Sequence, residues 1–262
     1  MIRNKTFIIT GASRGIGKAI ALKLAREGAN IVIASKSVQE DPRLGGTIYS
    51  AAEEVEQAGG KALAIPCDIR FEDQIANVVS QAVAVFGGID GLVNNASAIS
   101  LTPTGQTETK RLDLMYNINV RGTFLVTKHC LPYLKKSENP HILNLSPPLN
   151  ITPQWLGMSV PYSISKFNMS MMALGWSAEF RKEGIAANAL WPVTTIATAA
   201  VQNLLGGDEM IAHSRKPDIM ADAAHYILSQ PSRELTGNLF LDEDVLKKAG
   251  ITDLSSYAVT PG

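Results

Sequence analysis

Cysteine is scarce in this sequence of 262 residues, which contains only Cys67 and Cys130. Two cysteines so far apart along the chain provide neither a disulfide framework nor the clustered thiolates of a metal site. We therefore expect a protein of a reducing compartment that holds no metal.

Charge is also sparse, and it is balanced. Charged residues make up 18% of the chain, and the 24 lysines and arginines equal the 24 aspartates and glutamates. No net field therefore favours nucleic acid or an anionic membrane as a partner. No apolar run approaches the roughly 18 residues of a membrane span, and residues 1–5 leave no room for a signal peptide. We expect a soluble, cytoplasmic protein.

Apolar residues are abundant, at 45% of the chain, and they fall into short runs that alternate with helical patterns. This alternation predicts a doubly wound α/β fold, with a seven-stranded, mostly parallel sheet and helices on both faces. Strands are expected at residues 7–10, 29–34, 62–66, 91–94, 141–145, 185–190 and 238–241. Helices are expected at residues 18–26, 47–58, 71–86, 107–135, 160–183 and 217–229. Since no repeat or linker interrupts the pattern, residues 1–262 are expected to form a single domain.

Two of the expected connections are long, namely residues 35–46 and residues 192–216. Long connections at the carboxyl edge of a parallel sheet usually shape a ligand site. We expect residues 192–216 to form a lid over the site, with Gly206 and Gly207 as a hinge.

The segment Thr10-Gly-Ala-Ser-Arg-Gly-Ile-Gly17 follows an apolar, β-branched run and precedes a helical pattern. Glycine lets the backbone approach a pyrophosphate, and the helix N-terminus offers unpaired N–H groups to the phosphates. Glycines also serve ordinary turns. Because strand, turn and helix occur in the required order, we favour a dinucleotide site in a Rossmann-type fold.

Tyr162 and Lys166 lie four residues apart near the start of an expected helix, which places both side chains on one face. A nearby ammonium favours the phenolate and lowers the pKa of a tyrosine, so that it can act as an acid or base. Taken alone, the two residues are equally consistent with an exposed pair on a helix.

Several segments together resemble the short-chain dehydrogenase/reductase family in order and spacing. They are residues 10–17, Asn94-Asn-Ala96, residues 117–124, residues 143–146 and residues 162–166. The resemblance covers nearly the whole chain. It implies an oxidoreductase that moves a hydride between a nicotinamide and an alcohol or carbonyl carbon. Some relatives append a sterol-carrier domain, which we do not expect here because the sequence ends at Gly262.

The resemblance implies a role for each catalytic residue. Tyr162 exchanges a proton with the substrate oxygen, and Lys166 lowers the pKa of Tyr162 and binds the nicotinamide ribose. Asn119 holds a water that links Lys166 to solvent, unless it is a helix-interior asparagine bonded to the main chain. The family usually has Ser-Ser after the fifth strand, and the second serine polarises the substrate oxygen. Here the pair is Ser146-Pro147, so either Ser146 takes that role or the site works without a serine.

The resemblance also implies a set of residues that bind the cofactor. Asn95 and Ala96 lie near the adenosine ribose, or form a strand-end turn. Asp68 accepts from the adenine amino group, or caps the next helix. Thr194 meets the carboxamide, although Val193 stands where the family usually has glycine. The full set is Gly11, Ser13, Arg14, Gly15, Ile16, Gly17, Lys36, Asp68, Asn95, Ala96, Tyr162, Lys166 and Thr194.

The expected cofactor is NADP(H). NAD enzymes of this fold place a carboxylate after the second strand, where it binds the ribose 2′-hydroxyl. This chain instead has Ala34-Ser-Lys36, together with Arg14 in the glycine-rich turn. Both cations attract a 2′-phosphate, although Lys36 alone is equally consistent with a surface lysine.

The expected substrate is apolar and lipid-like, terpenoid or steroid-like. Residues 149–158 and 195–201, with Leu205, offer apolar side chains and few charges. They equally fit a lid that packs onto the body or onto another subunit. A second hypothesis is a catalytically weak nucleotide-binding sensor or a lipid-handling partner protein.

We also expect a homotetramer or homodimer. The helices expected at 107–135 and 160–183 carry more apolar surface than one sheet face covers, and in the family they pack against their copies. The apolar residues in question are Leu112, Leu114, Met115, Met171 and Trp176.

Overall fold

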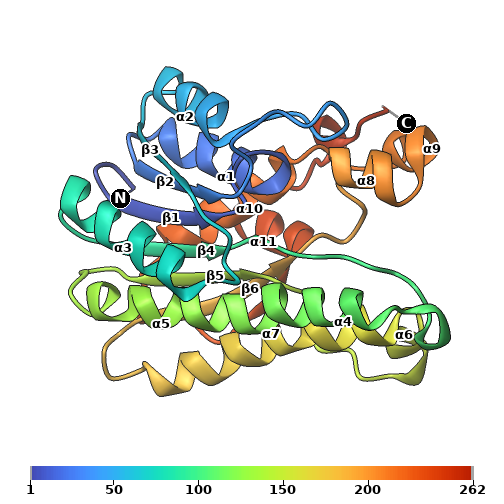
Figure 1. Cartoon of the computed structure of the whole chain (residues 1–262). Helices are drawn as coiled ribbons and strands as arrows, with labels where there is room; N and C mark the ends of the chain where they lie inside the picture. The colour runs from blue at the N-terminus through green and yellow to red at the C-terminus, as the bar shows by residue number, and fades with distance from the viewer. Residues whose placement is uncertain (1, 261–262) are drawn as a thin grey trace.

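Seven parallel strands form the centre of the computed structural model, which describes residues 2–260 apart from the side chain of Leu204 (Figure 1). The strand order is β3-β2-β1-β4-β5-β6-β7, and every neighbouring pair is parallel. The predicted doubly wound, Rossmann-type fold is confirmed. The strands are β1 Thr6–Thr10, β2 Asn30–Ser35, β3 Lys61–Pro66, β4 Gly91–Asn94, β5 His141–Leu145, β6 Ala186–Trp191 and β7 Leu239–Leu241.

Helices cover both faces of the sheet, as Figure 1 shows, and each face has its own apolar core. Successive strand residues point to opposite faces, so Ile9 belongs to one core and its neighbour Ile8 to the other. One core lies under α1 Gly15–Ala25, α2 Ile48–Gln57, α10 Asp218–Ser229 and α11 Asp242–Lys248. The other lies under α3 Glu72–Phe86, α5 Thr123–Leu134 and α7 Val160–Glu179.

The helix expected at 107–135 is interrupted. It consists of α4 Thr109–Met115, a π-helical turn over Tyr116–Gly122, and α5. Such turns insert one extra residue into a helix and occur often at functional sites. Here the π turn contains Asn119, whose buried side chain bonds outside its own helix.

Several short elements were not predicted, because they span too few residues for a helical period to show. Two of them, α8 and α9, lie within the expected lid. The unpredicted elements are α6 Pro153–Gly157, α8 Ala199–Leu204, α9 Gly207–Ala212, α11, and the 3₁₀ turns Thr104–Gln106 and Ser255–Tyr257.

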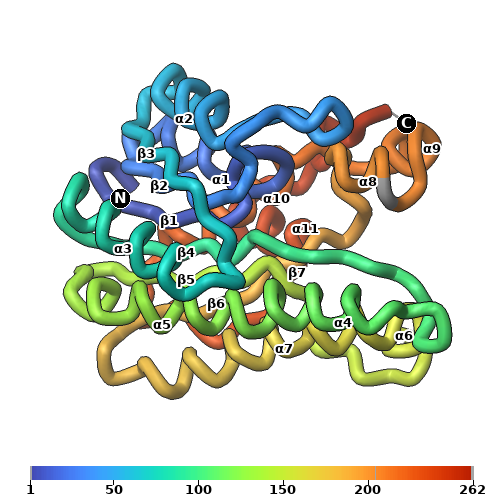
Figure 2. The backbone as a smooth tube through the Cα atoms, viewed as in Figure 1, coloured from blue at the N-terminus to red at the C-terminus, as the bar shows by residue number. Residues whose placement is uncertain are grey.

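Residues 192–216, the expected lid, lie over the carboxyl edge of the sheet beside the connection that follows β2, and Figure 2 shows the two segments next to each other. The Asn203 side chain of α8 donates to the Arg43 carbonyl at 2.7 Å. At the base of this segment, the backbone of Arg215 forms an isolated parallel β-bridge with Ile196 and an antiparallel one with Ala258. Gly207, with φ at 62°, is the first residue of α9 and directly follows the turn from α8.

Two of the five residues expected on an outer apolar face are buried. Met115 and Trp176 are only 1% and 5% exposed, because they pack within the core rather than outside it. Leu112 and Met171 are exposed. Other apolar side chains are exposed along the π-helical turn, α5 and α7, and we call the combined set the α4–α7 apolar face: Leu112, Tyr116, Phe124, Ile164 and Met171.

No helix within residues 2–260 is both long enough and apolar enough to cross a membrane.

Candidate active site

The glycine-rich turn leaves β1 and enters α1 as predicted. Gly11 and Gly15 have φ angles of 67° and 57°, a region that side chains disfavour. A Cβ on Gly17 would lie 2.5 Å from the Asn95 amide nitrogen. That amide donates to the Thr10 and Gly11 carbonyls at 2.8 and 3.1 Å. Only glycine therefore lets Asn95 hold the turn against the end of β4.

Thr10 fixes the other side of this junction, a role that the sequence analysis missed. Its hydroxyl accepts from the backbone N–H groups of Asn95 and Ala96, each at 3.0 Å. Asn95 and Ala96 thus lie beside the glycine-rich turn, and their place near the adenosine ribose stays a prediction. Asn94 instead points into the core, where it donates to Thr127 and Asn144.

Cations and hydroxyls gather where β2 ends beside the turn. Arg14 donates to the Ser37 hydroxyl, and its Nη1 atom is buried with no hydrogen-bond partner in residues 2–260. The hydroxyls of Ser13 and Ser35 lie 3.3 Å apart. Lys36 is exposed on the same connection. The arrangement offers an unpaired guanidinium N–H and several hydroxyls to an anion. No motif in the sequence singles out Ser37.

Asp68 lies after β3, but its carboxylate is already engaged. It forms a bidentate pair with Arg70, with the shortest separation at 2.5 Å. Arg70 holds the pKa of this carboxyl below its usual range, with a smaller contribution from Lys36. The alternative role as a helix cap is wrong, because the residue at the cap position of α3 is Phe71.

Lys166 is the most confined cation of the site. Its side chain is only 2% exposed, and its ammonium donates to the Leu145 carbonyl at 2.6 Å and to the Ser97 hydroxyl at 3.4 Å. Burial lowers the pKa of Lys166 to about 7. Since that value is close to neutral pH, the side chain can both hold and release a proton there.

Asn119 links Lys166 to Tyr162 through two serines that the sequence analysis missed. Its Oδ1 accepts from the Ser97 hydroxyl at 3.1 Å and from the Ala98 N–H at 2.8 Å. Its Nδ2 donates to the Ser165 hydroxyl, which in turn donates to the Tyr162 carbonyl. The alternative of bonding within its own helix is wrong, because these partners belong to α7 and to the segment after β4.

Tyr162 lies on α7 with Lys166 as predicted, but its pKa is shifted in the direction opposite to the one we expected. Burial raises the pKa of Tyr162, whereas we expected Lys166 to lower it. The Lys166 ammonium is directed at the Leu145 carbonyl, and loss of solvent around the phenol raises the pKa of Tyr162.

Ser146 does not reach the site surface. It is fully buried, and its hydroxyl has no hydrogen-bond partner among the described residues. Its N–H donates to the Leu190 carbonyl at 3.1 Å, which extends the pairing of β5 with β6. The buried hydroxyl gives no direct support to a catalytic role for Ser146, which stays a prediction.

Thr194 is partly exposed, and its hydroxyl donates weakly to the Thr195 carbonyl. Thr198, which was not predicted, lies closer to the glycine-rich turn. A Cβ built on Gly15 would lie 3.3 Å from the Thr198 methyl group. Thr198 also caps α8, so it joins the lid to the turn.

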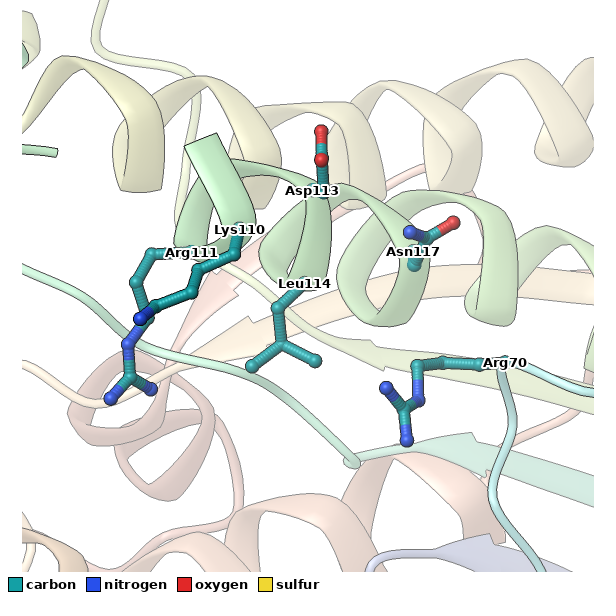
Figure 3. A pocket seen from close by; sticks show the side chains of 6 residues that line it. All are labelled: Arg70, Lys110, Arg111, Asp113, Leu114 and Asn117. Carbon is teal, nitrogen blue, oxygen red and sulfur yellow. The ribbon is translucent and has the colours of Figure 1, made fainter. Parts of the chain in front are cut away.

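A hollow of about 360 Å³ lies on α4 near Arg70, and Figure 3 shows Lys110 and Arg111 beside it. Its cations are partly satisfied, because Arg70 pairs with Asp68 and Lys110 pairs with Glu108. Within the described part of the chain, no group of three or more potential metal ligands gathers here or elsewhere.

Comparison with known proteins agrees with this geometry. A family model described as short chain dehydrogenase matches residues 5–207. Hydroxysteroid dehydrogenase-like protein 2 of Bos taurus is 58% identical over 257 residues, and that of Xenopus tropicalis is 60% identical. In both cases the match covers 98% of this chain and 61% of the relative, so the chain spans less than two thirds of their length.

A solved structure extends the likeness to three dimensions. The crystal structure of a short chain dehydrogenase from Mycobacterium thermoresistibile is 53% identical, with a TM-score of 0.95. The match covers 100% of this chain and 93% of that chain.

Replacing Lys166 by methionine tests the burial of the ammonium. The folded-state pKa of Lys166 lies near 7, so wild-type stability is expected to rise with pH between about 7 and the unfolded value near 10.5. Methionine binds no proton. The Tm of Lys166→Met minus that of wild type should therefore become more positive as the pH falls from about 10 to about 6.

Differential scanning fluorimetry across this pH range measures the effect, with Lys61→Met, at an exposed position on β3, as the control. A Tm difference for Lys166→Met that is independent of pH would contradict the burial argument.

Proposed function

Because the chain belongs to the short-chain dehydrogenase family, we propose that it transfers a hydride between NADP(H) and an alcohol or carbonyl carbon of an apolar substrate. One observation carries the proposal: Asn119 connects to the Lys166 ammonium through the Ser97 hydroxyl and to the Tyr162 carbonyl through the Ser165 hydroxyl. This network and the glycine-rich turn both lie at carboxyl ends of parallel strands, where ligands bind in such folds.

The chain fits a dinucleotide in two respects. A Cβ at Gly11 or Gly17 would fill the space beside Asn95 and Ala96, so the backbone is kept open for close approach. Arg14 has an unpaired, buried N–H group at the end of β2. The N-terminus of α1 and the turn would hold the pyrophosphate, while Arg14, Lys36 and Ser37 would hold a 2′-phosphate. The nicotinamide would supply or accept the hydride.

In the proposed reaction, Tyr162 transfers a proton to or from the substrate oxygen. The phenol is protonated at neutral pH, as donation to a carbonyl requires, although burial raises its pKa and so makes it a weaker acid. Lys166 then replaces that proton, and its pKa of about 7 suits this exchange. Ser97 would provide a route for the proton to solvent, because this residue is exposed and its hydroxyl is hydrogen-bonded to both Lys166 and Asn119.

The substrate class is inferred from the apolar surface near the start of α7. Ile151, Trp155 and Met158 are 77%, 54% and 70% exposed. They lie on the segment that leads from β5 to Tyr162, and Figure 1 shows α6 at the same end of the molecule as α8 and α9. Burial of such side chains against a ligand contributes about 1.5–3 kcal/mol each. A lipid-like, terpenoid or steroid-like substrate fits this surface.

A second function is favoured by one observation. Ser146 is buried and Pro147 follows it, so neither residue offers a hydroxyl to a substrate oxygen. A protein that binds the nucleotide without turnover, as a sensor or a lipid-handling partner, would tolerate this arrangement.

We also propose that the chain forms a homodimer or homotetramer through the α4–α7 apolar face. A monomer leaves its five apolar side chains at least 36% exposed, and a symmetric contact between two copies would remove them from water.

The cofactor assignment predicts tighter binding of NADP⁺ than of NAD⁺ in isothermal titration. Arg14→Ala should weaken NADP⁺ binding about tenfold or more, because a charge-assisted bond to the 2′-phosphate is lost. Binding of NAD⁺ by the same variant is the internal control and should change much less. Tighter binding of NAD⁺ by the wild-type protein would refute the assignment.

Tyr162→Phe should lower kcat about 10²-fold to 10⁴-fold while NADP⁺ affinity stays nearly intact, because the hydroxyl acts on the substrate oxygen. Lys166→Ala should reduce both turnover and cofactor affinity. Tyr49→Phe, at an exposed tyrosine on α2, is the matched control. If Tyr162→Phe turns over within a few-fold of wild type, the role as proton donor is wrong, and absence of turnover by the wild type supports the second function.

The apolar site predicts that kcat/KM for straight-chain aldehydes rises with chain length. Each additional buried methylene contributes about 0.8 kcal/mol, or roughly a fourfold increase. Consumption of NADPH across the series measures this dependence. A flat series, or a preference for small charged substrates, would remove the apolar substrate from the proposal.

The oligomer predicts a mass of two or four times the 28.1 kDa chain in light scattering. Met171→Glu should shift the mass toward one chain, because it places a charge in the apolar contact. Val85→Glu, at an exposed apolar position on α3, should leave the mass unchanged. A wild-type mass of one chain would exclude the oligomer.

A further inference from the structure

Trp191 is the last residue of β6, directly before the segment that leads into the lid. It pairs with Leu241 of β7. Side chains alternate along a strand, so Trp191 shares a face of the sheet with Ala187, which belongs to the core beneath α7. Between them on that face stands Ala189. Two small residues let α7 approach the sheet, and the large indole follows at the carboxyl end.

The indole covers the buried ammonium of Lys166. The Nζ atom lies 5.2 Å from the centre of the Trp191 ring, within the range of a cation–π contact. This attraction favours the charged form of an amine, and it strengthens where water is excluded. The 2% exposure of Lys166 meets that condition.

The other groups around the ammonium are neutral. They are the Leu145 carbonyl of β5, the Ser97 hydroxyl after β4 and, on α7 itself, the Met169 sulfur at 3.3 Å. The titratable neighbour on α7 is Tyr162. Among residues 2–260 no charged side chain contributes to the pKa of Lys166, which burial alone sets. The face of the indole is therefore the one further source of negative potential against the ammonium.

We propose that Trp191 is a positioning residue of the active site, which holds the Lys166 ammonium against the end of β5 and favours its protonated form. The catalytic part of this proposal rests on the proposed function, in which Lys166 returns a proton to Tyr162. The contact between the two side chains is independent of that function.

The direct test is an NMR titration of protein labelled with ¹³C at lysine Cε, with the Lys166 signal assigned by its loss in Lys166→Met. In Trp191→Leu the pKa of Lys166 should fall by about half a unit to one and a half units, because the ring no longer stabilises the charge. Trp191→Phe keeps a weaker ring and should give a smaller decrease. Trp155→Leu removes an exposed tryptophan elsewhere and should leave the pKa unchanged.

Incorporation of fluorinated tryptophans provides a second series that keeps the shape of the core. Fluorine withdraws charge from the face of the ring, so the pKa of Lys166 should fall stepwise with the number of fluorine atoms. This series decides the matter if Trp191→Leu does not fold. A pKa that is the same in every fluorinated protein, or in folded Trp191→Leu, would overturn the proposal.

Turnover separates this proposal from the proposed function. In Trp191→Leu, the limb of the kcat/KM profile that depends on Lys166 should move to lower pH by the amount found by NMR. A purely structural role would lower kcat/KM without moving the limb, and would count against Trp191 as a positioning residue. A shifted pKa in a protein without turnover would instead refute the proposed function and leave the contact established.

Discussion

The parallel pairing of every strand is the constraint on which the rest of the structure depends. Parallel strands need helical crossovers, and these cover both faces of the sheet, so its strands are almost wholly apolar. All the carboxyl ends then meet at one edge. The glycine-rich turn after β1, the Asn95 amide after β4 and the Leu145 carbonyl of β5 come together there, although they are far apart in sequence.

The buried Lys166 ammonium lies at this carboxyl edge of the sheet, and its burial is unfavourable in free energy. Removing a cation from water without an opposite charge is unfavourable, and the lowered pKa of Lys166 reflects this. The surrounding structure offsets part of the cost with the Leu145 carbonyl, the Ser97 hydroxyl and the Trp191 ring. The π turn in the helix of Asn119 belongs to the same arrangement, because it lies where the Asn119 amide reaches Ser97 and Ser165.

The pattern of apolar runs predicted all seven strands to within about one residue at each end, because a strand buried on both faces gives a strong signal. The lid helices were missed because α8 and α9 contain only six residues each. Helical spacing placed Tyr162 and Lys166 on one face, and the family resemblance pointed to Asn119. Ser97, Ser165 and Trp191 carry no such signal. Their importance comes from contacts between segments that only the folded chain brings together.

Ser146 shows how a local rule bears on a role that a motif alone leaves open. Asn144 lies two residues earlier on β5, and its side chain donates to the Met169 carbonyl of α7. Because strand side chains alternate with a period of two, Ser146 turns toward the same covered face and is fully buried. Pro147 follows it and has neither a hydroxyl nor an N–H group. In the proposed reaction, the polarisation of a substrate oxygen at the end of β5 would then come from Tyr162, supported by Lys166.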